Sequence, residues 1–246
     1  ADARAFAIWA GSQAVLEGLG VWAGIAPYAQ AMSRIEISDS ALDDGVRPTR
    51  LTYDAKTDDG RPVAHMVPAG LLHQALYDAV ARDDAVKWIA PADAIGFTAD
   101  AHTAAVTLSD GRVLDAALCV AAEGRRSTLR DAAGIKTMGW GYGQRGIVAT
   151  VAFEMGHDGV AIQHFLPGGP FAILPLQDNR ACITWSSTDA EAERVLALDD
   201  EAFLAELDLR IGGRFGAITL VGKRQSWPLD VKIARDFIAP RFALIG

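Results

Sequence analysis

Hydrophobic residues recur at helical spacing in three stretches of the chain. In each stretch the apolar positions repeat every three or four residues, as they do on the buried face of a surface helix. The pattern predicts three helices, over residues 4–19, 68–81 and 200–211. Gly20 and Gly212 directly follow the first and the last of these stretches, and glycine at such a position is typical of a helix end.

Strands are predicted by strict alternation of apolar and polar residues, or by short apolar runs between turn residues. Alternating runs cover residues 34–39 and 50–55. Turns that contain Gly, Pro or Asp separate four further runs in the most strand-rich part of the chain, 147–153, 161–166, 171–176 and 181–186. Because these four runs are joined by short turns, we expect them to form an antiparallel sheet.

The middle of the chain carries shorter strand signals. Strands are expected near residues 86–90 and 94–98, and a hairpin over 103–120 is predicted around the turn sequence Ser109-Asp110-Gly111. The second arm of this hairpin runs into residues 117–121, a continuous apolar run that is typical of a strand buried on both faces.

Composition limits the class of protein. The 246 residues are half hydrophobic and carry a net charge of −8, which suits one or two packed domains and disfavours both disorder and general nucleic-acid binding. No apolar run approaches the roughly 18 residues of a transmembrane helix. Cys119 and Cys182 lie in apolar, strand-like stretches, and we expect two buried thiols in a reducing, cytoplasmic compartment.

A glycine-rich segment at residues 141–146 matches G-x-G-x-x-G literally. The dinucleotide-binding fingerprint requires a strand before it and a helix that opens at its end, so that helix N–H groups meet the pyrophosphate. Here the β-branched run of residues 147–151 follows, which predicts a strand. We therefore expect a glycine-rich turn with exposed aromatic side chains, and no phosphate loop.

Signatures of hydrolases and metal enzymes are missing. The sequence has neither G-x-S-x-G nor His-Glu-x-x-His. No histidine has metal-ligand spacing to a second ligand, so all are expected at the surface or in the core: His65, His73, His102, His157 and His164. We predict no metal site and no catalytic side chain of these classes.

The segment from Leu118 to Arg130 carries the most informative chemistry. A buried strand ends in Glu123-Gly124, then come basic residues, and Ser127 is placed to cap a helix. Glycine lets the backbone approach a ligand closely, and a carboxylate at a strand end can accept a hydrogen bond from a ribose hydroxyl. A strand, a solvated turn and a helix without any ligand explain the same residues, and the two interpretations stay open here.

This segment resembles the second flavin motif of the class A flavoprotein monooxygenases, a strand followed by Ala-Asp-Gly-x-x-Ser-x-x-Arg; Glu123 stands where the family has Asp. The surrounding sequence is similar to the ubiquinone-biosynthesis hydroxylases, the 2-polyprenyl-6-methoxyphenol hydroxylase group. The similarity extends over the whole chain. It rests on Asp2-x-Arg4 and its following helix, His65-Met66-Val67-Pro68, Tyr142-x-Gln144, residues 165–176, Trp185, Trp227-Pro228-Leu229 and residues 243–246.

The resemblance implies an α/β fold like that of p-hydroxybenzoate hydroxylase, with an FAD domain interwoven with an antiparallel-sheet substrate domain. Two sets of segments are expected to build these domains. The partial FAD-binding domain takes 1–30, 66–82, 100–140 and 236–246, and the substrate domain takes 31–65, 83–99 and 141–235.

The resemblance also implies a reaction. FAD, reduced by NAD(P)H, reacts with O₂ to a C4a-hydroperoxide that hydroxylates an aromatic ring of a polyprenylated phenol in ubiquinone biosynthesis. The flavin performs the chemistry, so no catalytic side chain is expected. Two alternatives stay open: a hydroxylase of a soluble phenolic substrate, and a flavin-free, inactive fragment or binding module.

Site residues are carried over from the family position by position. The cofactor-binding set is Arg4, Gln74, Glu123, Gly124 and Arg130. The substrate-binding set is Leu174, Pro175 and Trp185. Each has a purely structural alternative: solvated surface charge or helix surface for the polar residues, and core packing for the apolar ones.

The resemblance finally implies where the protein acts and which partners it contacts. We expect peripheral association with the inner membrane and association with other quinone-biosynthesis proteins. The chain begins without Met and stops in the apolar run Phe242–Gly246, just at the approach to the family's third flavin motif. We therefore expect it to be part of a longer enzyme, and to be aggregation-prone alone.

Overall fold

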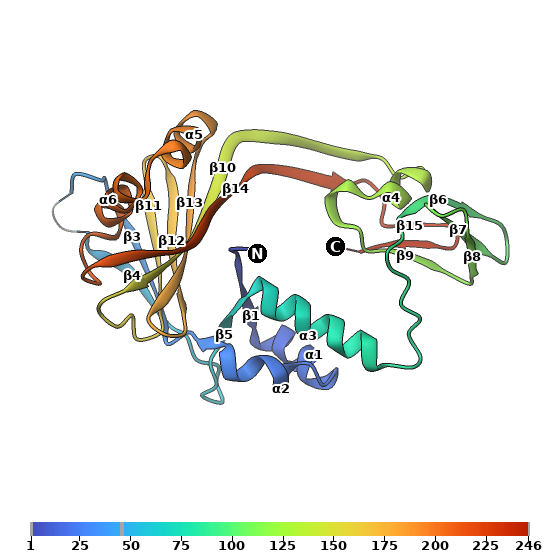
Figure 1. Cartoon of the computed structure of the whole chain (residues 1–246), viewed down its shortest axis with the longest axis horizontal. Coiled ribbons are helices and arrows are strands. Elements are labelled where there is room, and N and C mark those ends of the chain that lie inside the picture. Colours follow the sequence, from blue (N-terminus) through green and yellow to red (C-terminus); the bar gives the residue numbers. More distant parts are fainter. Residues whose placement is uncertain (1, 45–46, 246) are drawn as a thin grey trace. The chain divides into compact units, whose positions relative to one another are not determined.

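A computed structural model describes residues 2–44 and 47–245. The chain divides into two compact units (Figure 1): unit 1 comprises Ala1–Val86 and Gly143–Leu229, and unit 2 comprises Lys87–Tyr142 and Asp230–Gly246. Strands β10 (Thr137–Phe153) and β14 (Ile218–Ala234) contribute residues to both units. The boundaries of these units differ from those of the predicted FAD and substrate domains. The division of the chain into an FAD domain and a substrate domain stays a prediction.

Unit 1 is built on a sheet in which the described residues form seven strands, in the order β14-β10-β13-β12-β11-β3-β4. The remaining strands of this sheet are β3 (Arg34–Asp39), β4 (Thr49–Asp54), β11 (Val160–Leu166), β12 (Gly169–Leu176) and β13 (Arg180–Thr188). β11 pairs with β3 in parallel, while β10, β13, β12 and β11 pair in antiparallel succession. The predicted strands and the antiparallel sheet of residues 147–186 are confirmed.

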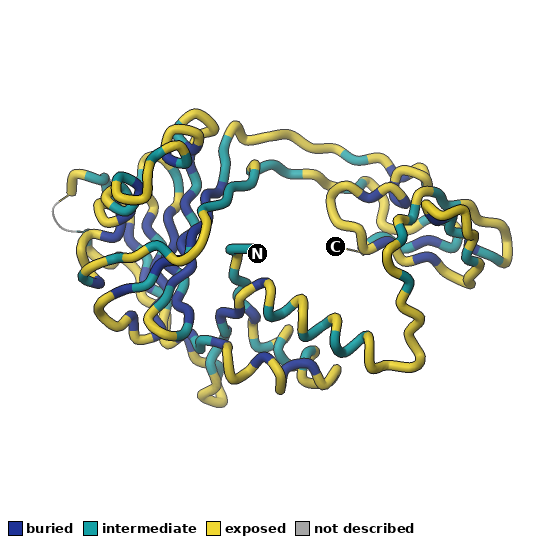
Figure 2. Tube along the Cα trace, viewed as in Figure 1, coloured by how far each residue is buried: buried dark blue, intermediate teal, exposed yellow. Residues whose placement is uncertain are grey.

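The two faces of this sheet bury different side chains, because successive residues of a strand point to opposite sides. One face carries Phe171, Ile183 and their neighbours under two helices, α5 (Asp189–Ala197) and α6 (Asp200–Ile211). The opposite face carries Val148 and Leu176 in a second cluster with Met66. Figure 2 shows the buried stretches along these strands.

Helix α6 confirms the predicted helix over residues 200–211. It ends at Gly212, whose φ of 78° lies in the left-handed region that favours glycine. Its N-cap is Asp199, whose carboxylate accepts a hydrogen bond of 2.8 Å from the backbone N–H of Ala202. Residues next to the helix, Asp199 and Gly212, therefore determine where it begins and ends.

The Asp199 cap gives a stability prediction. We expect Asp199→Ala to lower the free energy of unfolding by about 1 kcal/mol, the usual effect of losing an N-terminal cap. Chemical denaturation of the whole protein measures it. Asp199→Asn keeps a capping oxygen and should stay close to wild type; an Asp199→Ala variant as stable as wild type would show that the cap contributes nothing.

The N-terminal part of unit 1 differs from the prediction. Residues 4–19 were expected to be one helix, but Ala5–Trp9 form strand β1, and helix α1 covers only Ala10–Gly18. The reason is a non-local partner, since β1 pairs residue by residue with β5 (Ala64–Pro68). That backbone pairing outweighs the local helical spacing of the apolar residues.

The rest of this region surrounds β5. Among the described residues β1, β5 and β2 (Gln30–Ala31) form a three-stranded sheet. Helix α3 (Ala69–Arg82) confirms the helix predicted over 68–81. The short helix α2 (Trp22–Ile25) and the 3₁₀ turn η1 (Ala26–Tyr28) follow α1, and the apolar residues of α1, α2 and α3 pack in one cluster around Val67.

Unit 2 contains two small sheets in its described residues, β6-β7-β8 and β15-β16-β9. The predicted hairpin is confirmed by β7 (Ala104–Leu108) and β8 (Val113–Ala116), and β6 (Ala94–Ala99) confirms the strand near 94–98. The strand predicted at 86–90 is wrong. That segment has no strand pairing, and its Trp88 is largely exposed.

Strand β9 (Cys119–Ala121) was expected to be buried on both faces. The structure corrects this, because Cys119 and Ala121 are buried while Val120 between them is 49% exposed. β9 pairs in parallel with β16 (Phe242–Leu244), which pairs with β15 (Ile238–Ala239). After β9 come the 3₁₀ turn η2 (Gly124–Arg126) and helix α4 (Thr128–Ala132).

The glycine-rich segment 141–146 lies inside strand β10, so the predicted turn is wrong. Trp140 and Tyr142 are exposed, as expected. No helix begins at the end of this segment, which continues as strand to Phe153. The geometry of a phosphate loop is therefore not formed here.

Candidate functional site

A pocket of about 390 Å³ in unit 1 contains one of the predicted cofactor residues, Arg4. Its walls come from the residues before β1, the turn η1, the junction of β5 and α3, the turn from β12 to β13, the C-terminal part of β10 and the N-terminal part of β14. The lining residues are Asp2, Ala3, Arg4, Tyr28, Pro68, Leu71, Thr150, Leu176, Gln177, Asp178, Arg180 and Val221. Leu176 belongs to the core cluster on the sheet face opposite α5 and α6, so the pocket opens on that side.

The Arg4 side chain is held by a carboxylate and two aromatic rings. Its Nε and Nη2 donate to the Asp2 carboxylate at 2.6–3.0 Å, and its Cζ lies 5.0 Å from the centroid of Trp227 and 5.7 Å from that of Phe6. The hydrogen bond lowers the pKa of the Asp2 carboxyl and raises the pKa of the Arg4 guanidinium. Nη1 of Arg4 has no partner among the described residues, so its N–H groups are left to donate to an anion.

The second predicted cofactor residue of unit 1, Gln74, lies on the exposed side of α3. Its Nε2 donates to the carboxylate of Asp78, one turn further, at 2.8 Å. It does not line the Arg4 pocket. The apolar face of the same helix, with Leu72 and Leu76, packs into the cluster around Val67.

The predicted substrate residues lie on two different faces of the sheet. Leu174 packs beside Leu176 in the cluster on the side of the Arg4 pocket. Trp185 is 3% exposed and packs on the helix-covered face, with the Arg210 guanidinium 3.8 Å from its ring centroid. Pro175 is buried next to Leu174 in β12, and the alternation of the strand turns it away from Leu174. The structure does not bring Leu174 and Trp185 to one surface.

Unit 2 holds the other predicted cofactor residues at the junction between β9 and α4. Oε2 of Glu123 accepts hydrogen bonds from Ser127 Oγ at 2.5 Å and from the Leu129 backbone N–H at 3.0 Å. Ser127 caps α4 by accepting from the Arg130 N–H, as predicted. Oε1 of Glu123 has no partner in the described part of the chain, so it is free to accept from a ligand hydroxyl.

Gly124 follows with a φ of 69°, and the space where a side chain would stand is open. Only glycine adopts this conformation without strain, and it leaves the backbone accessible to a ligand.

Arg130, in contrast to Gly124, is buried. Its side chain is 5% exposed and is engaged by the Asp131 carboxylate and by the Arg125 carbonyl oxygen. The buried Arg130 guanidinium thus stabilises the turn η2 by a hydrogen bond within the chain.

Sequence reasoning did not assign Thr150, Arg180 or Tyr28, which line the Arg4 pocket. Thr150 and Arg180 lie on β10 and β13, far from Arg4 in the sequence, and Tyr28 lies in the turn η1. All three meet Arg4 only in the folded chain. Arg180 does carry a local signal, since it pairs with Asp178 in the turn before β13. Nothing in the sequence connects that turn with Arg4.

Histidine and cysteine side chains are mostly structural. His157 is buried and hydrogen-bonded to the Leu176 carbonyl at 2.7 Å and to the Gly159 N–H at 3.0 Å. Cys119 and Cys182 are buried free thiols, which confirms their predicted burial. Burial raises the pKa of the Cys182 thiol to about 11. Across residues 2–44 and 47–245, no three His, Cys, Asp or Glu side chains gather at a metal-binding spacing, and no helix is long and apolar enough to cross a membrane.

The structure is similar to solved flavin-dependent monooxygenases. It matches the monooxygenase PieE, solved with FAD and substrate, with a TM-score of 0.75 at 16% identity over 99% of this chain and 46% of that one. It matches 2-methyl-3-hydroxypyridine-5-carboxylic acid oxygenase with a TM-score of 0.72 at 20% identity over 98% and 64%. The fold is therefore that of the flavin-dependent monooxygenases, and the predicted α/β fold of p-hydroxybenzoate-hydroxylase type is confirmed.

The family follows from the sequence comparison. The family model described as FAD binding domain matches residues 1–246, so this chain belongs to that family, and the resemblance to class A flavin monooxygenases is confirmed. Ubiquinone hydroxylase UbiL of Rhodospirillum rubrum is 38% identical over 245 residues, 100% of this chain and 56% of that protein. The 3-demethoxyubiquinol 3-hydroxylase of Escherichia coli is 28% identical over 246 residues, 100% and 61%.

A mitochondrial relative matches as well. The ubiquinone biosynthesis monooxygenase COQ6 of Rattus norvegicus is 32% identical over 211 residues, which cover 82% of this chain and 43% of that protein. The chain thus spans only part of the length of each of these relatives.

Proposed function

We propose that this chain is part of an FAD-dependent monooxygenase that hydroxylates the aromatic ring of a polyprenylated phenol in ubiquinone biosynthesis. NAD(P)H and O₂ are the co-substrates. The observation that carries the proposal is the 38% identity to ubiquinone hydroxylase UbiL along the whole chain. We also propose peripheral membrane association and contact with other quinone-biosynthesis proteins, since a prenylated substrate partitions into lipid.

The described residues fit a flavin dinucleotide at two places, each within its own unit. Arg4 keeps Nη1 free beside its Asp2 pair, and that donor suits a phosphate oxygen. Glu123 keeps Oε1 free next to an open glycine, which suits a ribose hydroxyl. Among the predicted cofactor residues, Arg4, Glu123 and Gly124 thus carry the cofactor proposal, while Gln74 and Arg130 are engaged by neighbouring groups of the chain.

When bound, the flavin supplies the redox chemistry that activates dioxygen. The chain's own residues bind and exclude water. Asp2 and Trp227 hold the Arg4 guanidinium in place, and Leu176, from the same cluster as Leu174, gives the Arg4 pocket an apolar wall. Such a wall accommodates an apolar substrate and keeps water from the reacting groups. Trp185 packs in the core cluster on the opposite, helix-covered face of the sheet.

The test is a product analysis with the whole protein, FAD, NAD(P)H and ¹⁸O₂. We expect a prenylated phenol to gain one labelled hydroxyl, with the second oxygen released as water and NAD(P)H oxidised in equal amount. An unprenylated phenol serves as the matched control and should react more slowly. Faster reaction of the unprenylated phenol would favour the soluble-substrate hydroxylase, and NAD(P)H-independent or unlabelled product would contradict the monooxygenase.

A further inference from the structure

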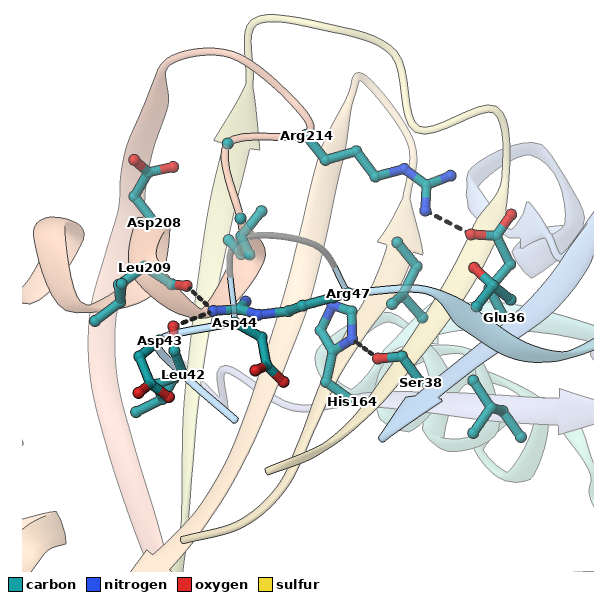
Figure 3. A pocket seen from close by; sticks show the side chains of 16 residues that line it. Glu36, Ser38, Leu42, Asp43, Asp44, Arg47, His164, Asp208, Leu209 and Arg214 are labelled. Atoms are coloured by element: carbon teal, nitrogen blue, oxygen red, sulfur yellow. Dashed lines mark hydrogen bonds and ion pairs between the residues drawn. The ribbon is translucent and has the colours of Figure 1, made fainter. Parts of the chain in front are cut away.

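A second cavity, of about 570 Å³, lies in unit 1 on the helix-covered side of the sheet (Figure 3). Its lining comes from β3 and β11, from Leu42, Asp43, Asp44 and Arg47, and from the C-terminal end of α6 with the residues after it. It shares no lining residue with the Arg4 pocket. Its Ile162 and Ile211 belong to the core cluster under α5 and α6, on the opposite face from Leu176. Nothing in the proposed monooxygenase reaction uses this cavity.

The floor of the cavity carries a buried polar pair. Ser38 and His164 are direct partners in the parallel pairing of β3 and β11, and they are 3% and 8% exposed. Ser38 Oγ is hydrogen-bonded to Nδ1 of His164. Nε2 of His164 has no partner in the described part of the chain. In the tautomer protonated at Nε2, the serine hydroxyl donates to Nδ1, and the free Nε2–H is a donor within the cavity.

Two arginines add positive charge beside this pair. The terminal nitrogens of Arg47 donate to the carbonyl oxygens of Leu42, Leu209 and Arg210 at 2.5–2.9 Å. Its Nε is buried and has no hydrogen-bond partner. A buried N–H without an acceptor costs free energy, so an acceptor from a ligand would be favourable at this atom.

Arg214 projects from the loop after α6 and donates to Glu36 at 2.5 Å, and Arg34 donates to the same carboxylate at 2.7 Å. These partners lower the pKa of Glu36, which stays ionised. Burial first, then the charges of Arg47 and Arg214, lower the pKa of His164 to about 4, with Glu36 acting in the opposite sense. The imidazole is therefore neutral at pH 7.

Acidic residues occupy the outer part of the cavity. Asp43, Asp44 and Asp208 line it and are exposed. Their charges repel a ligand with several negative groups, such as a nucleotide. Leu42, Ile162 and Ile211 supply apolar surface between the acidic rim and the floor.

We propose that this cavity binds a small molecule with a single carboxylate and an apolar body. The carboxylate accepts from Arg47 Nε and His164 Nε2–H and faces the Arg214 guanidinium, while the apolar body lies against Ile162 and Ile211. The volume lies within the range of roughly 300–1,000 Å³ that is usual for small-molecule sites. Buried donors of this kind recognise a carboxylate, because hydrogen bonds to charged groups are the stronger ones.

The test uses benzoate as the probe and the His164 ring signals of the whole protein as the readout, followed by NMR. This readout separates the cavity from any aromatic site elsewhere. We expect benzoate to shift the His164 signals in a saturable way and to raise the His164 pKa above its ligand-free value of about 4, because a bound anion stabilises the imidazolium. Benzamide and benzylamine are the neutral and the cationic controls, and both should bind more weakly.

Two arginine variants give a matched comparison. Arg214→Gln and Arg34→Gln each remove one partner of Glu36, but only Arg214 lines the cavity. We expect Arg214→Gln to weaken benzoate binding about tenfold or more and Arg34→Gln to leave it within about twofold. Equal effects of the two variants, preference for benzylamine, or unshifted His164 signals at saturating benzoate would overturn the proposal.

Discussion

The Arg4→Gln variant of the whole protein should bind FAD about 10- to 100-fold more weakly than wild type, since a charge-assisted hydrogen bond contributes about 1.5–3 kcal/mol. Arg4 is the one predicted cofactor residue that lines the unit 1 pocket of about 390 Å³, and its Nη1 is free to donate. Glutamine keeps a polar amide but removes the positive charge and the reach of the guanidinium. Titration of the apoprotein with FAD, followed by flavin fluorescence, measures the affinity.

Arg61→Gln is the control for this variant. Arg61 pairs with Asp59, two residues earlier, as Arg4 pairs with Asp2, but it lies in an exposed turn and lines none of the pockets described above. The FAD affinity of the Arg61→Gln variant should equal that of wild type. If Arg4→Gln also retains wild-type affinity, Arg4 does not bind the cofactor, and the phosphate contact has to be sought elsewhere.

The Phe171→Ala variant should lose about 3–5 kcal/mol of unfolding free energy, the usual cost of truncating a fully buried aromatic residue. Phe171 is 0% exposed and lies in β12, with its ring 6.2 Å from that of Trp185 and 6.4 Å from that of His164. Its removal leaves a cavity beneath α6. Urea denaturation followed by tryptophan fluorescence measures the loss.

Phe165 provides the comparison for the core prediction. It stands on the neighbouring strand β11 and is 49% exposed, so Phe165→Ala should cost less than about 1 kcal/mol. A loss below about 1.5 kcal/mol for Phe171→Ala would mean that the helix-covered face is loosely packed, in conflict with the described core.

Local signals predicted much of this fold. The strands of residues 147–186 were predictable because turn residues separate four apolar runs, and α6 because its apolar residues repeat at helical spacing and Gly212 follows them. Prediction failed where pairing is non-local. Strand β1 is specified by β5, almost sixty residues away in the sequence, and its own apolar spacing equally suits a helix. Helix α5 was missed because it is only nine residues long and rich in charged residues.

The candidate site was only partly accessible to sequence reasoning. The Asp2–Arg4 pair is local, and so is the contact of Glu123 with Ser127, so motif matching found both regions. The position of Trp185 on the opposite face from Leu174 follows from the sheet register, which local sequence does not determine. Arg130 was predicted from its place in the motif, and its burial against Asp131 became visible only in the structure.

Flavin binding by the whole protein tests the central claim most directly. The protein is to be stripped of cofactor and titrated with FAD while its visible absorption is recorded. We expect saturable binding with one FAD per chain and the altered flavin spectrum of a protein-bound isoalloxazine. A whole protein that stays colourless and never saturates with FAD would contradict the assignment of this chain to a working flavin monooxygenase.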